Sequence, residues 1–165
     1  MIRPVRPEDA EQLAALYLAN RDFLAPFEPV RPPVFFTREG QRARLRRQLD
    51  GGTHPFVILD DGSIAGTINL FGIVPEGLQS GVIGYWIDRR RNGRGLATGA
   101  VGEILDYAFG RLELHRIEAA TLVDNVPSQR VLEKNGFERI GVARRYLRIN
   151  GSWRDFVLFQ RLADD

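Results

Sequence analysis

Residues 84–99 contain amino acids whose types and spacing could bind a phosphorylated ligand. They read as a strand, a basic glycine loop and the start of a helix. Gly93 and Gly95 let the backbone pass close to a ligand, because neither residue carries a Cβ atom. Several loop N–H groups can then point in one direction, beside the positive end of the helix that follows. Fixed positive charge surrounds the loop at Arg89, Arg90, Arg91 and Arg94. The pattern predicts a site for a diphosphate.

Two familiar phosphate-binding loops do not fit these residues. A P-loop ends in Gly-Lys-Ser/Thr, and this triplet does not occur in the chain. The dinucleotide fingerprint G-x-G-x-x-G would need glycine at position 98, where the chain has Thr98. That fingerprint also belongs to the first βα turn of its fold, whereas this loop lies mid-chain. ATP on a P-loop and NAD on a Rossmann fold are therefore disfavoured. A glycine-rich turn with solvated arginines stays open as the alternative.

A second group of residues, 124–137, follows the strand-like run 116–122 and contains the pattern N-x-x-S-x-x-V-L-E-K-x-G-F. Together with the glycine loop, this pattern resembles the GNAT superfamily of acetyl-CoA-dependent N-acetyltransferases. Residues 21–29 and 146–155 resemble the RimJ/RimL branch, the ribosomal-protein N-terminal acetyltransferases, and residues 114–119 also fit that branch. The resemblance covers essentially the whole chain. Its motifs are specific for superfamily and cofactor, and much less so for the acceptor.

The resemblance implies that acetyl-CoA lies along one strand and the glycine loop. The diphosphate would lie on backbone N–H groups of residues 93–98, and the pantetheine arm would pair with residues 85–87. The implied cofactor-binding residues are Tyr85, Trp86, Ile87, Asn92, Gly93, Arg94, Gly95, Leu96, Ala97, Thr98, Asn125 and Arg130. Asn92 stands where the family pattern Q/R-x-x-G-x-G/A has Gln or Arg. The Ile87 N–H is the expected oxyanion donor, and one such donor is worth about 3 kcal/mol of barrier. For Tyr85 and Trp86 the alternative is ordinary strand packing.

The second group also supplies implied catalytic residues. Asn125 matches the motif asparagine that contacts the pantetheine arm, and its alternative is a plain helix N-cap. Ser128 corresponds to the serine that protonates the departing thiolate in this branch, and its alternative is a first-turn serine bonded to the backbone. Arg130 and Lys134 could meet the nucleotide phosphates or form a solvated helix face.

The chain departs from the family at the usual positions of acid and base. Leu132 stands where many relatives have a tyrosine acid, and Ala120 where some have a glutamate base. Ile140 replaces the RimL-type glutamate after Gly-Phe. Glu28 and Asp155 are the remaining carboxylates inside branch-specific segments. We expect Glu28 to face the incoming amine, with residues 23–29 forming a wall of the acceptor pocket. The alternative is that this stretch only packs under the sheet.

The missing base favours one class of acceptor. A peptide α-amine has a pKa near 7.8, so roughly a third of it is neutral at pH 7.5, whereas a lysine amine near 10.4 is only about 0.1% neutral. That difference corresponds to roughly 3 kcal/mol. A site without a dedicated base therefore suits a protein N-terminus better than a lysine or polyamine. A small acceptor pocket walled by residues 23–29 would admit an N-terminal Ala or Ser and exclude long lysine side chains.

Other functions stay open. The same scaffold could acetylate a small amine, such as an antibiotic or an amino-acid derivative. A CoA-binding module without turnover is a second alternative, and a basic RNA-associated protein is a third. The last would need a contiguous positive face with exposed aromatic residues, whereas most aromatic residues here lie in apolar strand-like runs. The sequence leaves the oligomeric state open, a homodimer included.

Composition is that of one soluble domain spanning residues 1–165. Hydrophobic residues make up 44% and charged residues 27% of the chain, and the formal net charge is +2. No run approaches eighteen apolar residues, no signal-peptide pattern is seen, and no cysteine is present. We therefore expect a cytoplasmic protein that has no disulfide or metal site, does not enter a membrane and does not bind nucleic acid directly.

The apolar patterns predict a mixed α/β fold. Periodic apolar positions predict a helix that starts at residues 7–9, a second helix capped by Thr37, and a third from Leu96 closed by Gly110. Asp61-Gly62 and Asn150-Gly151 are hairpin turn signals between strand-like runs. The expected order is βααβββαβαββ, which matches the GNAT fold of the resemblance: a central mixed, twisted sheet flanked by helices.

Overall fold

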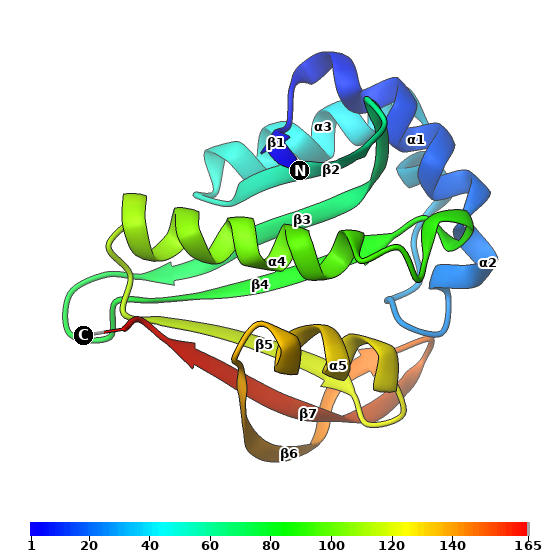
Figure 1. Cartoon of the computed structure of the whole chain (residues 1–165). Coiled ribbons are helices and arrows are strands. Elements are labelled where there is room, and N and C mark those ends of the chain that lie inside the picture. The colour runs from blue at the N-terminus through cyan, green and yellow to red at the C-terminus, as the bar shows by residue number, and fades with distance from the viewer. Residues whose placement is uncertain (165) are drawn as a thin grey trace.

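The computed structural model describes residues 1–164 and contains one sheet of seven strands in the order β1-β2-β3-β4-β5-β7-β6 (Figure 1). The strands are β1 (Ile2–Pro4), β2 (His54–Asp60), β3 (Ser63–Val74), β4 (Ser80–Ile87), β5 (Arg116–Leu122), β6 (Glu138–Ile149) and β7 (Ser152–Leu162). Neighbouring strands are antiparallel except for β4 and β5, which are parallel. The expected mixed sheet is confirmed.

Within residues 1–164, five α-helices accompany the sheet: α1 (Ala10–Ala19), α2 (Arg21–Leu24), α3 (Arg38–Asp50), α4 (Leu96–Asp106) and α5 (Val126–Lys134). Shorter turns are η1 (Pro7–Asp9), η2 (Pro33–Phe36), η3 (Arg89–Arg91) and η4 (Tyr107–Arg111). The expected element order is confirmed, with the four-residue α2 as an addition. One boundary was wrong, because Gly110 does not close its helix. After α4 the backbone forms the wider helical turn η4, which includes Gly110 and ends at Arg111.

Alternating side chains on the central strands build two cores on opposite faces of the sheet. On one face, Ile68, Ile83 and Ile87 pack with α4 and its buried Val101 and Ile104. On the other face, Val57 and Ile64 pack with residues of α1 and α3. Figure 1 shows α4 and α5 on the near face of the sheet and α3 behind it. The helical apolar stripe predicted from Leu96 onward is thus the surface that α4 buries.

The two hairpin turns confirm the turn signals in the sequence. Asp61 and Gly62 have φ of 48° and 78°, and Asn150 and Gly151 have φ of 50° and 84°. Two consecutive left-handed residues match the right-handed twist of the strands on either side, which explains the preference for Asp-Gly and Asn-Gly at these positions. Both turns bear on the site, because Asp60 precedes the first and Asn150 lies in a pocket described below.

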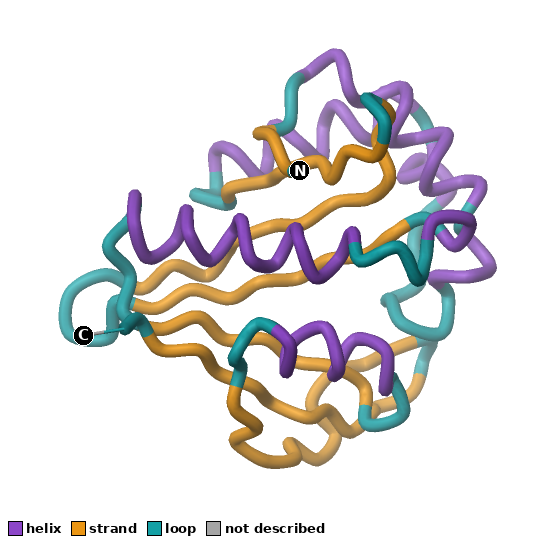
Figure 2. The backbone as a smooth tube through the Cα atoms, viewed as in Figure 1, coloured by secondary structure: helices purple, strands orange, loops and turns teal. Residues whose placement is uncertain are grey.

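The sheet opens between β4 and β5. The two strands pair only at Ser80–Arg116, Gly81–Ile117 and Val82–Glu118. Figure 2 shows them separating beyond these pairs, so that the ends of β4 and β5 lie apart. The C-terminal half of β4 therefore borders an opening in the sheet. Within residues 1–164, no helix has the length and apolar content needed to cross a membrane.

Candidate functional site

The loop between β4 and α4 has the backbone that a phosphate ligand requires. Gly93 and Gly95 have φ of 77° and 78°, and a Cβ placed at either would meet no protein atom within 4 Å. The first hydrogen bond into α4 runs from the Gly99 N–H to the Gly95 oxygen, 3.0 Å long. The N–H groups of residues 96–98 precede this bond and have no acceptor within the helix ladder. The loop thus presents bare backbone donors at the positive end of a helix.

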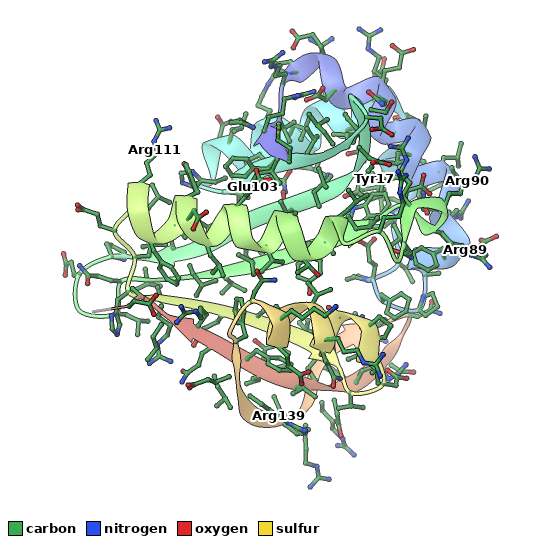
Figure 3. All side chains as sticks on the ribbon, viewed as in Figure 1. Tyr17, Arg89, Arg90, Glu103, Arg111 and Arg139 are labelled. Carbon is green, nitrogen blue, oxygen red and sulfur yellow. The ribbon has the colours of Figure 1, made fainter. Side chains whose placement is uncertain are left out.

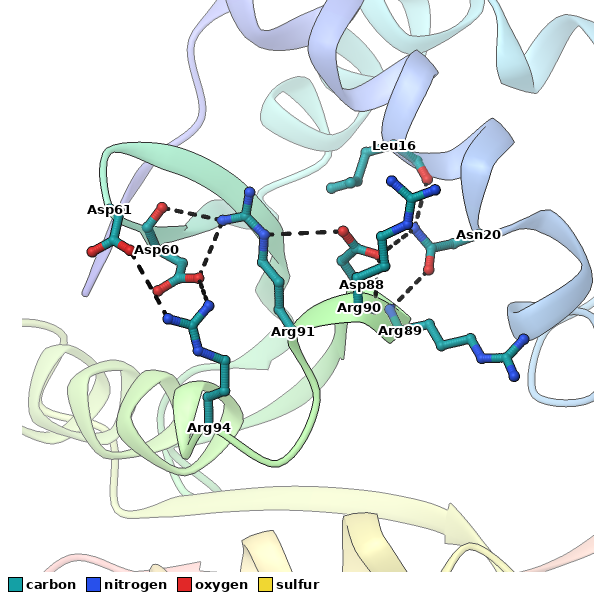
Figure 4. Close-up of polar contacts among 9 residues, drawn as sticks. All are labelled: Leu16, Asn20, Asp60, Asp61, Asp88, Arg89, Arg90, Arg91 and Arg94. Carbon is teal, nitrogen blue, oxygen red and sulfur yellow. Dashed lines mark hydrogen bonds and ion pairs between the residues drawn. The ribbon is translucent and has the colours of Figure 1, made fainter.

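The loop arginines differ in what they contact. Arg91 and Arg94 both reach the Asp60 carboxylate, at 3.3 Å and 2.5 Å, and Arg94 also lies 3.9 Å from Asp61 (Figure 4). Within residues 1–164, the guanidinium groups of Arg89 and Arg90 have no ion-pair partner, and Figure 3 shows both at the outer end of the loop. Two of the four charges predicted to surround the loop are therefore neutralised by the β2–β3 turn.

Asn20 anchors the start of the same loop from the end of α1. Its Nδ2 donates to the Leu16 oxygen and to Asp88 Oδ1, and its Oδ1 accepts from the Arg89 N–H (Figure 4). Asn20 is only 2% exposed. The sequence analysis missed both Asn20 and Asp60. Neither lies in a motif, and each acts on a segment that is distant in the chain.

The free edge of β4 carries the expected oxyanion donor. The Asp88 N–H donates to the Ala65 oxygen of the neighbouring β3, at 2.7 Å. Because N–H groups of an antiparallel strand alternate between its two edges, the N–H groups of Tyr85 and Ile87 turn away from β3. They face the opening toward β5, beyond the last β4–β5 pair. The Ile87 N–H therefore faces the opening, and its role as oxyanion donor stays a prediction.

The Trp86 side chain lies on the face of the sheet that packs with α1 and α3, opposite to the face covered by α4. Its Nε1 donates to the Tyr17 hydroxyl at 3.0 Å, and the two rings lie 4.7 Å apart. Tyr17 is 2% exposed and also contacts Phe35 edge-on. Its place at the junction of α1 and β4 is seen in Figure 3. The strand-packing alternative thus describes the Trp86 side chain, while its backbone belongs to the ladder with β3.

Tyr85 reaches across the opening to α5. Its hydroxyl lies 2.9 Å from Ser128 Oγ and 3.2 Å from the Ser128 carbonyl oxygen. Asn125 caps the same helix, since its Oδ1 accepts from the Ser128 N–H at 3.4 Å. Burial raises the pKa of Tyr85 to about 12, with the hydrogen bond to Ser128 acting in the opposite direction. Tyr85 therefore stays protonated at neutral pH. The contact joins two strongly separated segments and carries no signal in the sequence.

The remaining predicted residues fall into two groups. Asn92 and Arg130 are exposed, Asn92 in the loop and Arg130 on α5, while the Thr98 carbonyl accepts from Asn135 Nδ2 at 3.2 Å and so joins α4 to α5. The positions where relatives place an acid or base hold packing or surface residues: Leu132 is fully buried, Ala120 packs against a small core, and Ile140 is 53% exposed.

A pocket of about 180 Å³ lies on the Trp86 side of β4. Its lining comes from α1, α2 and the segment after it, η2 and the β6–β7 turn: Tyr17, Arg21, Leu24, Ala25, Glu28, Pro29, Val30, Arg31, Phe36 and Asn150. The Glu28 carboxylate lies 3.6 Å from Arg31 Nε and is 23% exposed. The predicted acceptor wall is thus part of a pocket. Asp155 instead accepts from the Arg145 N–H at 2.8 Å and holds the β6 backbone.

These residues fit the diphosphate and pantetheine arm of CoA. The loop offers open space above two left-handed glycines and several helix-end N–H groups, and the neighbouring β4 edge offers donors toward the opening. Both features lie on one continuous stretch, residues 85–98. A ligand with an anionic end and an amide-containing arm matches this order of donors.

Comparison with known proteins identifies the family. The family model described as an acetyltransferase (GNAT) domain matches residues 1–138. The chain is 41% identical over 170 residues to the probable N-acetyltransferase YjcK of Bacillus subtilis, over 99% of this chain and 94% of that protein. The crystal structure of the ribosomal-protein-S5-alanine acetyltransferase from Vibrio fischeri is similar with a TM-score of 0.94 and 35% identity, over 99% of this chain and 93% of that chain.

A second solved structure, Mycobacterium smegmatis RimJ in complex with CoA-disulfide, has a TM-score of 0.91 and 36% identity, over 98% of this chain and 81% of that chain. The chain belongs to the GNAT acetyltransferase family. It is an N-acetyltransferase that uses acetyl-CoA, and its relatives include ribosomal-protein-alanine N-acetyltransferases of the RimJ/RimL type. The resemblance found in the sequence is confirmed at this level.

Proposed function

We propose that this enzyme acetylates the α-amine of a protein N-terminus that begins with Ala or Ser, with a ribosomal protein as acceptor. The observation that carries the proposal is the small pocket containing Glu28 on the far side of β4 from α4. A ribosomal acceptor is also what the names of relatives suggest, among them the [ribosomal protein uS5]-alanine N-acetyltransferase of Escherichia coli, which is 34% identical over 96% of this chain. Such an acceptor would place the enzyme in the cytoplasm.

The size of the pocket favours a short acceptor residue. Sites for whole small molecules commonly occupy about 300–1,000 Å³, whereas this pocket measures about 180 Å³. Ala and Ser at a peptide N-terminus present a small side chain and an α-amine that is substantially neutral near pH 7.5. Glu28 offers an acceptor for the N–H groups of that amine. A bulky antibiotic amine fits these dimensions less well.

The proposal gives a task to the glycine loop, the Ile87 N–H, Ser128 and Glu28. Acetyl-CoA supplies the acetyl group as an activated thioester. Residues 93–98 hold its diphosphate through backbone N–H groups, and the Ile87 N–H donates to the thioester carbonyl oxygen as negative charge develops there. Ser128 gives its hydroxyl proton to the sulfur that leaves. Glu28 orients the amine, and the proton that the amine loses passes through water to the Ser128 oxygen.

Peptides test the acceptor class. Thiol release from acetyl-CoA is measured with a peptide beginning with Ala, with the same peptide blocked at its N-terminus but carrying an internal lysine, and with a panel of small amines. We expect turnover only with the free Ala peptide, and a similar rate with Ser. Comparable acetylation of the blocked peptide would contradict the proposal. Activity confined to a small amine would show instead that the enzyme acetylates small molecules. CoA binding without any turnover would show that the protein is a CoA-binding module.

Glu28 is tested by Glu28→Gln beside Asp22→Asn. Asp22 carries the same charge on the neighbouring α2 but is exposed and does not line the pocket. We expect Glu28→Gln to raise the KM for the Ala peptide about tenfold, equivalent to about 1.4 kcal/mol, with the KM for acetyl-CoA unchanged. Asp22→Asn is expected to change neither. Equal effects of the two variants would show that only net charge matters and would remove Glu28 from the pocket's function.

A further inference from the structure

Tyr85 and Ser128 approach each other across the opening in the sheet, although one lies on β4 and the other on α5. The phenol oxygen is 2.9 Å from Ser128 Oγ, a normal length for a hydrogen bond between hydroxyl groups. It is also 3.2 Å from the Ser128 carbonyl oxygen. Two arrangements of protons satisfy these distances. Tyr85 donates either to Ser128 Oγ or to the carbonyl oxygen, and the serine proton is free only in the first.

We propose that Tyr85 is a positioning residue that donates its hydrogen bond to Ser128 Oγ, so that the serine proton points to the sulfur of the departing thiol. This inference rests on the proposed role of Ser128. In the transfer, the amine nitrogen bonds to the acetyl carbon, the C–S bond breaks, and its electron pair goes to sulfur. Sulfur takes the Ser128 proton, and the serine oxygen regains a proton through water from the one that the amine releases.

Tyr85 keeps its own proton throughout this sequence. Burial raises its pKa to about 12, so the phenol acts as a steady hydrogen-bond donor and not as the acid. Its donation stabilises the negative charge that develops on Ser128 Oγ while the serine proton leaves. No other phenol is offered by α5, because the position where many relatives have a tyrosine acid is Leu132, which is fully buried in the core.

The geometry also explains why Tyr85, and not Trp86, is the residue of β4 that meets Ser128. Tyr85 belongs to the face of β4 that packs with α4, whereas the next residue, Trp86, packs with Tyr17 on the other face. Only one of the two aromatic residues of β4 can therefore reach α5. A phenylalanine at position 85 would keep the ring in place and remove the hydroxyl alone.

The test compares Tyr85→Phe, Ser128→Ala and the double variant with Tyr107→Phe as a matched control. The Tyr107 hydroxyl makes an equally short hydrogen bond, 2.8 Å to His54 Nδ1, away from the site. We expect Tyr85→Phe and Ser128→Ala each to lower kcat between tenfold and a hundredfold, while the Kd of CoA measured by calorimetry changes less than twofold. The double variant should lose no more than the worse single variant, and Tyr107→Phe should keep wild-type kcat.

Two results would each overturn the inference: an unchanged kcat in Tyr85→Phe, and multiplying losses in the double variant. Kinetics are measured with whichever amine the wild-type enzyme accepts, so a wrong acceptor proposal would leave this result readable.

Discussion

The β4–α4 loop and the pocket that contains Glu28 are built in opposite ways. The loop and the β4 edge form one continuous stretch, residues 85–98, and the backbone N–H groups of this stretch make the proposed contacts to acetyl-CoA. The pocket instead takes its lining from α1, α2 and the segment after it, η2 and the β6–β7 turn, including Glu28 and Asn150. A diphosphate is bound by N–H groups that any sequence with the right backbone can provide. An acceptor is selected by side chains that only the fold brings together.

This difference has a consequence for specificity. We expect substitutions in the pocket lining to change the acceptor without disturbing the loop, because no residue of the stretch 85–98 lines the pocket. Conversely, the loop is fastened by Asp60 and Asn20, neither of which lines the acceptor pocket. The two regions can therefore be disturbed separately.

The first prediction concerns the loop backbone. Gly95→Ala adds a methyl group that meets no protein atom but forces alanine into φ of 78°, at a cost of about 1–2 kcal/mol. Gly52→Ala is the control, with φ of 73° and equally open surroundings. Both should lose similar stability, but only Gly95→Ala should lose about a hundredfold in CoA affinity, equivalent to about 3 kcal/mol. Calorimetry showing equal CoA affinity in the two variants would reduce the loop to a simple turn.

The second prediction concerns alkaline stability. Because the pKa of Tyr85 is raised to about 12 in the folded state from about 10 in the unfolded chain, the folded state binds more protons between these values. The stabilisation is fully present below pH 10 and is lost as pH rises toward 12, by up to about 3 kcal/mol. Urea unfolding at pH 8, 10 and 11 should show this loss in the wild type and a smaller one in Tyr85→Phe. If the unfolding free energies of the wild type and Tyr85→Phe changed with pH in parallel, the pKa of Tyr85 would not be raised by burial.

The third prediction concerns the anchor of the loop. Asp60→Asn leaves Arg91 and Arg94 without their shared carboxylate, and hydrogen bonds to charged groups are worth about 1.5–3 kcal/mol, so we expect a loss of about 2 kcal/mol in unfolding free energy. Asp61→Asn is the control, because Asp61 is 92% exposed and 3.9 Å from Arg94. It should change stability by less than about 0.5 kcal/mol. Equal losses in thermal unfolding would mean that the two arginines are not held by Asp60.

The smallest effect separates helix capping from catalysis. Asn125→Ala and Thr37→Ala each remove a side-chain cap, since Asn125 accepts from the Ser128 N–H and Thr37 from the Gly40 N–H. Each should cost about 1 kcal/mol of stability. Only Asn125→Ala should also lower turnover, because its helix carries Ser128 into the opening. Unchanged turnover in Asn125→Ala would show that Asn125 only caps α5 and has no role in turnover.

The sequence by itself determined the features that depend on local backbone chemistry. Turn pairs such as Asn150-Gly151, the cap at Thr37 and the apolar stripe from Leu96 each act within a few residues, so their patterns predicted the elements correctly. The glycine loop and the resemblance carried by residues 124–137 indicated the family in the same way. The end of α4 was missed at Gly110, because a wider helical turn continued where a glycine usually stops a helix.

Only the tertiary structure decided which side chains meet. The contact of Tyr85 with Ser128, the hold of Asn20 on the Arg89 N–H, and the neutralisation of Arg91 and Arg94 by Asp60 all join residues separated by 30 or more positions. No periodicity or spacing records such contacts. The Tyr85 contact arises because the sheet opens between β4 and β5 and because successive side chains of β4 face opposite cores. The contacts of Asn20 and Asp60 arise because the ends of α1 and β2 pack beside the loop.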